Sequence, residues 1–180
     1  MADRPVGDLL SDARAGRPEA VARLCAEFYP RILTYMRYRV DATNAEDLTS
    51  EVFVRVLRGV ADQKGSFAAW VFTIAANVVV DHLRSRSARK EVAMNNTIED
   101  AALAPAATPH PADSNADLAA AIAELTADQR ELVTLKFING LSNAEIAEAT
   151  GKRPEAIRAL QFRALMALRQ ILDRRTGRQS

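Results

Sequence analysis

The feature that most constrains this chain is a pair of short predicted helices separated by a glycine turn, over residues 142–163. Ser142 and Glu145 have the spacing of a capping box, which predicts that a helix begins directly after the serine. Gly151 supplies the left-handed residue that ends this helix, and Pro154 suits the first turn of the next one. This is the steric pattern of a DNA-binding helix-turn-helix, so the second helix is predicted to read the major groove.

Bulk composition places the chain among ordinary globular proteins of one large or two small domains. It has 180 residues, of which 48% are hydrophobic and 26% are charged. We find no apolar run of membrane-spanning length and no apolar leader, so neither membrane insertion nor export is expected. The single cysteine, Cys25, excludes an internal disulfide and favours a reducing, cytoplasmic location. Its apolar neighbours predict that it is a small core residue.

The charge distribution is uneven. A net charge of +1 is low for a protein that binds DNA unaided. Basic residues are instead concentrated near 84–90, 152–163 and 174–178, whereas acidic residues gather at 46–51 and 99–117. Such a separation suits a protein that meets more than one kind of partner.

Helical periodicity defines two domains. Residues 1–92 are predicted to form an N-terminal helical bundle, and residues 117–180 a C-terminal helix-turn-helix domain. Between them, residues 93–116 are rich in alanine and proline and have no period, so we predict a flexible linker. No strand is expected, and the predicted fold class is all-α. Within the bundle, Thr43 or Asn44 is expected to cap a helix.

The helix expected over about 45–57 carries an acidic and apolar face. Glu46, Asp47 and Glu51 recur at helical spacing, close to Val54. This combination favours docking of a protein, because DNA phosphates would be repelled. The alternative interpretation is a solvated face with ordinary salt bridges.

A long apolar helix expected to begin at Ser66 combines aromatic residues with a basic end. Trp70 lies near its start, after a polar loop, and His82 and Arg84 open the basic run. Aromatic rings beside cations suit unstacked bases and single-strand phosphates. Packing of Trp70 inside the bundle is the alternative, and for this residue it is the favoured one.

The sequence contains no pattern of catalytic or metal-binding residues, so we expect neither enzyme activity nor a cofactor. The two histidines, His82 and His110, lie at a basic helix end and in the proline-rich segment. Asp81 and His82 are adjacent on a helix and therefore point apart. A nucleophile–base set, a metal-ligand cluster and a glycine-rich phosphate loop are all missing from the sequence.

Both halves of the chain resemble the sigma-70 family of bacterial transcription initiation factors. Residues 44–57 resemble the helix that binds core RNA polymerase, and residues 65–84 resemble the helix that melts promoters and reads the −10 element. Residues 125–163 resemble the domain that reads the −35 element. The short length, without an expected further domain, points to the extracytoplasmic-function (ECF) subgroup. The resemblance covers about residues 8–172 apart from the linker, and two motifs in the right order make it specific.

The resemblance assigns residues to three kinds of contact. Those implied for polymerase binding are Glu46, Asp47, Leu48, Glu51, Val54 and Arg55. Those implied for the −10 region are Asp62, Gln63 and Lys64, which would capture a flipped base, with Trp70, His82, Arg84 and Arg86. Those implied for the −35 region are Arg153, Glu155, Arg158, Ala159, Phe162 and Arg163. The implied partners are core RNA polymerase, promoter DNA and a dedicated anti-sigma factor.

The chain also departs from the family pattern. Thr73 and Ala76 stand where related chains often carry arginines, so either the basic run 84–90 compensates or promoter melting is weak. Arg153 replaces the usual Ser or Thr cap of the reader helix. Two other functions stay open: a repressor or activator that uses only the helix-turn-helix, and a sigma-like mimic that binds a regulator protein and not DNA.

Overall fold

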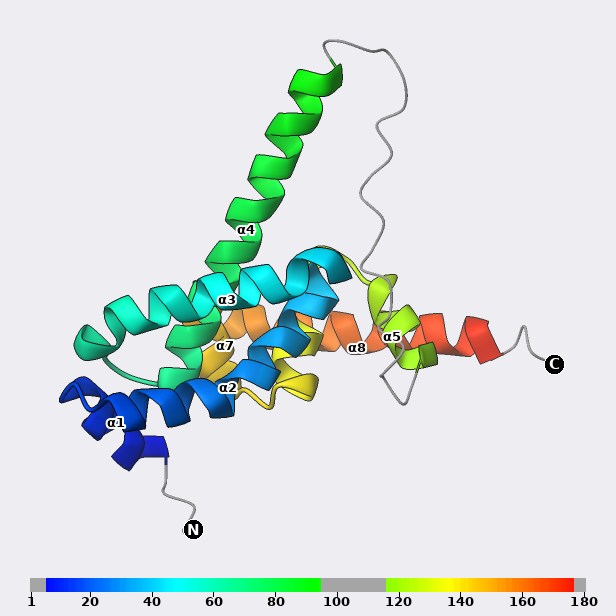
Figure 1. Cartoon of the computed structure of the whole chain (residues 1–180). Helices are drawn as coiled ribbons and strands as arrows, with labels where there is room; N and C mark the ends of the chain where they lie inside the picture. Colours follow the sequence, from blue (N-terminus) through cyan, green and yellow to red (C-terminus); the bar gives the residue numbers. More distant parts are fainter. Residues whose placement is uncertain (1–5, 95–115, 177–180) are drawn as a thin grey trace.

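The computed structural model describes residues 6–94 and 116–176, and this part of the chain is helical, without a β-strand (Figure 1). The all-α prediction is therefore confirmed. The N-terminal half contains α1 (Val6–Arg14), α2 (Pro18–Arg39), α3 (Ala42–Gly59), the short 3-10 helix η1 (Val60–Asp62) and α4 (Phe67–Met94). The C-terminal half contains α5 (Ala116–Ala123), α6 (Ala127–Val133), the π-helical turn η2 (Thr134–Ile138), α7 (Asn143–Thr150) and α8 (Pro154–Thr176).

The linker predicted over 93–116 lies almost wholly outside the described residues. Its first two positions are the last residues of α4, and its last position, Ala116, begins α5. The domain limits derived from the sequence therefore stay a prediction.

Helix α3 begins earlier than the sequence indicates. Asp41, and not Thr43 or Asn44, is the residue that precedes it, and the Asp41 side chain forms no capping hydrogen bond. Its carboxylate instead accepts a hydrogen bond from Arg86 of α4. The predicted cap was wrong because α3 begins at Ala42, so that Thr43 and Asn44 lie inside its first turn.

Apolar stripes on α1 to α4 form the core of the N-terminal half. The stripe of α2 includes Phe28 and Tyr35, both almost completely buried. Phe28 meets Phe67 edge to face at a centroid distance of 5.0 Å, and Tyr35 meets Phe72 in the same manner at 5.6 Å. Each buried aromatic side chain stabilises the fold by about 1.5–3 kcal/mol through burial, and the ring pairs add to this.

Helix α4 is the longest and most apolar helix of the bundle. Residues Phe67–Arg89 are long and apolar enough to cross a membrane, so the expectation that no segment reaches this length is wrong. However, Val71, Phe72 and Ala75 are completely buried in the hydrophobic core. A core helix meets the same length and composition criterion, and here the apolar face packs inward.

The helix-turn-helix is built as the sequence predicts. Ser142 and Glu145 form a complete capping box at the start of α7, and Gly151 ends this helix with a left-handed φ of +67°. Helix α8 begins at Pro154, and its inward stripe includes the fully buried Ile157 and Ala164. The cap and the turn predicted for this motif are confirmed.

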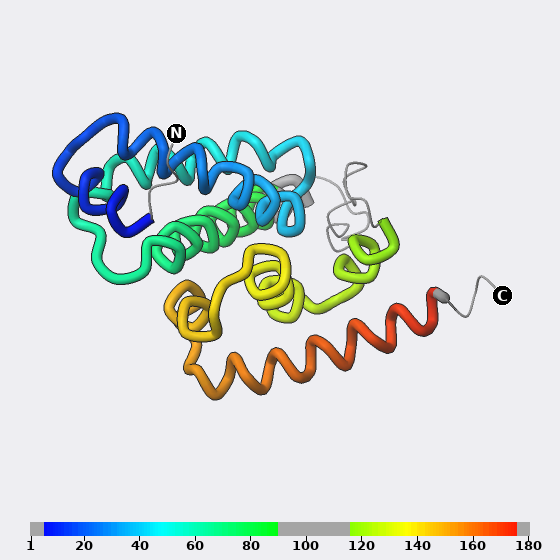
Figure 2. Tube along the Cα trace, turned by 90° about the horizontal axis from the view of Figure 1, so that it is seen from below, coloured from blue at the N-terminus to red at the C-terminus, as the bar shows by residue number. Residues whose placement is uncertain are grey.

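The two halves of the chain pack against one another. Figure 2 shows the yellow to red C-terminal helices running along one side of the blue to green N-terminal helices. Helix α7 lies against α4, and α6 and η2 lie against α2. Buried apolar residues of both halves belong to one continuous core. The sequence indicated two domains on a tether and did not predict this docking.

Candidate functional site

The exposed face of α3 has the acidic and apolar character that the sequence indicated. Glu46 and Asp47 are exposed, and Val54 and Leu57 are exposed to 44% and 56%. Two large aliphatic side chains in water on one helix face are unusual for a surface that binds nothing.

An ion-pair triad orders one edge of this face. Arg55 donates to Glu51 of its own helix at 2.6 Å and lies 3.3 Å from the carboxylate of Asp81 on α4. The charge of Glu51 is therefore partly compensated by Arg55. Asp47 forms no ion pair among the described residues, so its carboxylate is more available to a partner. The side chain of Leu48 is only 9% exposed, so in this conformation Leu48 is a core residue and not part of the surface.

The loop before α4 exposes only two of the three residues implied for capture of a flipped base. Asp62 and Lys64 are exposed, but Gln63 is buried. The Gln63 amide accepts from Arg14 at 2.6 Å and donates to the carbonyls of Lys64 and Gly65 at 2.7 and 3.2 Å. Gln63 therefore holds the loop in shape, and its side chain is fully engaged within the chain.

Trp70 packs beneath this loop. A Cβ on Gly59 would lie only 3.1 Å from the indole ring, so any larger residue there would be in tight contact with Trp70. The ring also tilts against Phe67 at a centroid distance of 5.7 Å. This arrangement agrees with the packing interpretation of Trp70.

Helix α7 lies against the start of α4. The Ser66 hydroxyl donates to Glu145 Oε1 at 2.9 Å, and a Cβ on Gly65 would lie 3.5 Å from Glu148. Partial burial raises the pKa of Glu145, but hydrogen bonds from Ser142 and Ser66 and the charge of Arg31 outweigh it, so its pKa lies below the usual value. The helix-turn-helix therefore touches the loop that the sequence assigned to the −10 region.

The basic end of α4 lines a pocket with the start of α3. The lining residues are His82, Arg86 and Arg89 of α4, with Asp41 and Asn44, around a volume of about 340 Å³. Arg84 is exposed and does not line it. Two of the predicted −10 residues are thus brought together with three residues that the sequence analysis did not assign.

The second helix of the helix-turn-helix presents its predicted face to solvent. All six residues assigned to the −35 region are exposed, and Phe162 reaches 68%. Asn143 of α7 donates to Gln161 of α8 at 3.0 Å, which fixes the angle between the two helices. Arg158 is paired with Glu155 at 3.2 Å, whereas Arg163 extends from the middle of the helix.

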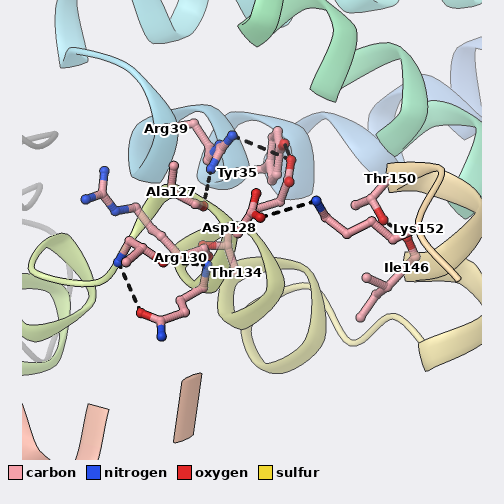
Figure 3. A network of polar contacts seen from close by, with 12 residues as sticks. Tyr35, Arg39, Ala127, Asp128, Arg130, Thr134, Ile146, Thr150 and Lys152 are labelled. Carbon is pink, nitrogen blue, oxygen red and sulfur yellow. Dashed lines mark hydrogen bonds and ion pairs between the residues drawn. The ribbon is translucent and has the colours of Figure 1, made fainter. Parts of the chain in front are cut away.

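A polar network joins the two halves (Figure 3). Tyr35 of α2 donates to Glu131 of α6 at 3.0 Å, and Arg39 donates to the carbonyl of Ala127 at 2.8 Å and lies 3.6 Å from Glu131. Complete burial raises the pKa of Tyr35, and the negative charge of Glu131 raises it further. The phenol is therefore held as a neutral donor.

Arg31 makes a second link between the halves. Its guanidinium lies over the ring of Phe28 at 4.6 Å and donates to the backbone carbonyl of Asn139 at 2.6 Å. Asn139 ends the π-helical turn η2, and its side-chain amide donates to the carbonyl of Thr134 at 3.0 Å. The irregular turn thus presents a carbonyl that an arginine of the other half satisfies.

The sequence analysis missed this interface, although its residues are visible in the sequence. Arg31, Tyr35 and Arg39 recur every four residues on α2, a spacing that places them on one helix face. Polar groups in an otherwise apolar stripe are the available signal for a buried network. Within residues 6–94 and 116–176, no group of three or more His, Cys, Asp or Glu side chains is placed to hold a metal ion.

Comparison with known proteins extends these observations. The family model for sigma-70 region 2 matches residues 24–89, and that for sigma-70 region 4 matches residues 115–168. The ECF RNA polymerase sigma factor BldN of Streptomyces coelicolor is 39% identical over 92% of this chain and 65% of its own length. SigE of Mycolicibacterium smegmatis is 32% identical over 97% of this chain and 71% of its own, and ShbA of Streptomyces griseus is 32% identical over 93% and 95%.

Two solved structures have the same fold. One is CnrH in complex with the cytosolic domain of CnrY, with a TM-score of 0.67, 25% identity and coverage of 92% of this chain and 95% of that chain. The other is the sigma factor RpoE in complex with the anti-sigma factor NepR from Bartonella quintana, with a TM-score of 0.71, 23% identity and coverage of 84% and 96%.

The fold and its surfaces define a two-domain, helix-turn-helix transcription factor. The family matches and the relatives make the assignment specific: the chain belongs to the sigma-70 family, among the ECF RNA polymerase sigma factors.

Proposed function

We propose that this chain is a promoter-specificity subunit of RNA polymerase that acts in the cytoplasm and has no catalytic activity of its own. The exposed face of α3 binds core polymerase. Helix α8 binds the −35 element, and the loop 59–65 with α4 engages the −10 element.

The observation that carries this proposal is the presence of two opposite kinds of surface on one chain. The α3 face offers Glu46, Asp47 and exposed aliphatic side chains, which suit a protein partner. Helix α8 offers Arg158 and Arg163 on the outer side of a helix-turn-helix, which suit DNA. A repressor that acts alone has no need of the first surface.

Action at two promoter elements requires the docked halves to separate. Glu145 and Glu148 of α7 lie against Ser66 and Gly65, so the loop that would receive a flipped base has carboxylates beside it. Negative side chains at this place repel the DNA backbone. Polymerase would therefore bind the chain in an opened form, with the two domains placed on their own elements.

An anti-sigma factor is the third partner that we propose. Support comes from the similar structure of RpoE, which was solved with the anti-sigma factor NepR. Co-purification from the native host tests this partner: a second small protein is expected with the chain in polymerase-free fractions. Recovery with polymerase alone would contradict it.

Run-off transcription tests the main proposal. Core polymerase is combined with the chain on a library of randomised promoters, and the expected result is initiation at a defined pair of spaced elements only when the chain is present. Asp47→Lys should abolish polymerase binding, because it reverses a charge in the centre of the α3 face. Asp8→Lys is the matched control, since it reverses an exposed charge on α1.

The alternatives predict other results. If the chain binds DNA but adds no initiation to core polymerase, it is a repressor or activator that uses the helix-turn-helix alone. If it binds neither DNA nor polymerase, it is a mimic that binds a regulator.

A further inference from the structure

Helix α4 has a second covered face, on the side away from the core of its own bundle. Val71, Ala75 and Val78 are buried and belong to the hydrophobic core. Successive residues of an α-helix are turned by about 100°, which places Ala69 and Thr73 on the opposite side of α4. Ala69 is nevertheless completely buried. An element outside the N-terminal core must therefore cover this face.

The covering element is α7 of the C-terminal half. It lies beside the first turns of α4 (Figure 1 and Figure 2), and no other pair of described helices from the two halves is in such extensive contact. Ser66, at the start of the covered face, donates to Glu145 of α7 at 2.9 Å. Ala69 and the buried Ala149 each lie one turn further along their helices, on the same faces as these two residues. Their small side chains allow the two helices to approach closely.

Thr73 and Ala76 continue the covered face beyond Ala69. They follow it by four and seven residues, and both are half-buried. These are the two positions at which the chain departs from the family pattern. The Thr73 hydroxyl donates to the carbonyl of Ala69 at 2.8 Å, so it is turned back onto its own helix. Small, uncharged side chains at these positions leave room for α7.

Helix α8 is not covered in this way. The six residues implied for the −35 region are all exposed in the same docked arrangement, and Phe162 reaches 68%. The docked chain therefore covers one of its two predicted DNA surfaces and leaves the other open.

We infer that α7 is an autoinhibitory element that acts on α4 alone: the docked chain binds a −35 duplex but cannot bind −10 DNA. The inference rests on the proposed function, which assigns α4 and the loop before it to the −10 element. Helix α7 excludes DNA because it occupies one face of α4 and carries Glu145 and Glu148 beside the loop. An order of events follows. Helix α8 can engage the −35 element before the halves separate, whereas contact with the −10 element requires separation first.

Small-angle X-ray scattering of the full chain tests the covering contact without polymerase or DNA. Ala69→Gln places a larger side chain under α7, and in the separated form the same position faces solvent. The variant should therefore have a larger radius of gyration than the wild type, with its helical content kept. Ala26→Gln makes the same change at an exposed position of α2 and should scatter like the wild type. An unchanged radius of gyration for Ala69→Gln would overturn the inference.

Binding of two short DNAs tests what the contact controls. Both come from a promoter selected by run-off transcription: the −35 element as a duplex, and each strand of the −10 element as a single-stranded oligonucleotide. Ala69→Gln should bind one −10 strand about tenfold more tightly than the wild type, the gain expected if about one chain in ten is separated at rest. Its affinity for the −35 duplex should be unchanged. Equal gains for both DNAs would overturn the inference, because α8 would then be masked as well.

A chain locked in the docked form provides a second test that holds even if Ala69→Gln does not fold. The double variant Ser66→Cys and Glu145→Cys is joined by a short, reducible thiol reagent across the 2.9 Å contact. The locked chain should bind the −35 duplex as the unlocked chain does and should lose binding of the −10 strand until reductant is added. Retained −10 binding would reject the autoinhibitory role, while promoter-dependent run-off transcription by the wild type would leave the proposed function standing. If no promoter is selected at all, the proposed function itself fails.

Discussion

The hydroxyl group of Tyr35 donates a hydrogen bond of 3.0 Å to Glu131, and this bond joins the N-terminal bundle to the helix-turn-helix domain. The tyrosine is completely buried, and its ring also meets Phe72 edge to face. Arg39 lies 3.6 Å from the same carboxylate, so the negative charge has two partners from α2. The docking of the two domains therefore depends on a polar network as well as on apolar burial.

Tyr35→Phe should destabilise the docked chain by about 1–2 kcal/mol, because it removes a hydrogen bond from the partly buried Glu131 carboxylate and leaves the ring in place. Denaturant unfolding measures this change. Tyr29→Phe is the matched control, since Tyr29 is 40% exposed and stacks on Phe53; we expect a change below about 0.5 kcal/mol. Equal losses in the two variants would contradict a specific role for the Tyr35 hydroxyl.

Holding the domains together should block transcription. Cysteines placed at Ser66 and Glu145, whose side chains touch at 2.9 Å, can be joined by a short, reducible bifunctional thiol reagent. The joined protein should lose most run-off transcription with core polymerase, and cleavage by reductant should restore it. Cys25 interferes little, because burial raises its pKa and lowers its thiolate fraction.

Each single-cysteine variant treated with the same reagent is the control for this experiment. Full transcription by the joined protein would show that the docked arrangement is compatible with promoter opening. The requirement for separation in the proposed function would then be wrong.

The sequence predicted local structure well where a short motif determines it. Ser142, Glu145 and Gly151 act through their own backbone and nearest turns, so their roles follow from spacing alone. The cap of α3 was wrong because this helix begins at Ala42, and Asp41 before it accepts a hydrogen bond from Arg86, 45 positions away. Long-range pairing of this kind leaves no periodic trace in the sequence.

In the candidate site, too, some features could be expected before the structure was known, whereas features that depend on long-range packing could not. The DNA-facing residues of α8 were implied by the family resemblance, and all six of them are exposed in the structure. Leu48 and Gln63 are buried, which depends on how α3 and the loop pack against the rest of the bundle. The pocket residues Asp41, Asn44 and Arg89 could not be grouped, since only the crossing of α3 and α4 brings them together.

Gly151→Ala should destabilise the C-terminal domain by about 1–2 kcal/mol. Its φ of +67° is unfavourable for any residue with a Cβ, although a Cβ there would meet no neighbouring atom. Gly7→Ala, in α1 with no positive φ and open space around it, should be neutral or stabilise by up to about 1 kcal/mol. Thermal unfolding of both variants measures the difference, and a neutral Gly151→Ala would contradict the strain argument.

Lowering the pH should weaken the N-terminal cap of α7, because Glu145 becomes protonated and no longer accepts hydrogen bonds as a carboxylate. Its pKa in the folded chain is lower than in the unfolded chain, so its contribution to stability is full above the unfolded value. This contribution is lost as the pH falls through the folded value. Glu145→Gln should therefore lower stability at neutral pH by about 1 kcal/mol and reduce the loss on acidification.

Unfolding measured across the acidic range, with Glu148→Gln on the exposed face of α7 as the control, checks this prediction. The wild type and the Glu148 variant should lose stability in parallel as the pH falls. A Glu145 variant that follows the same curve would show that the carboxylate adds nothing to the cap.

Arg163→Ala should weaken binding of the holoenzyme to all of its promoters by a similar factor and lower the salt dependence by about one unit. The reason is that an exposed arginine in the middle of α8 most often holds a phosphate, and phosphate contacts are blind to sequence. Arg169→Ala is the control, because Arg169 lies further along the helix and is paired with Asp173 at 3.8 Å. Affinity measured over a salt series on several promoter variants checks both changes. A loss of about 1–3 kcal/mol confined to promoters with one particular guanine would instead make Arg163 a base reader.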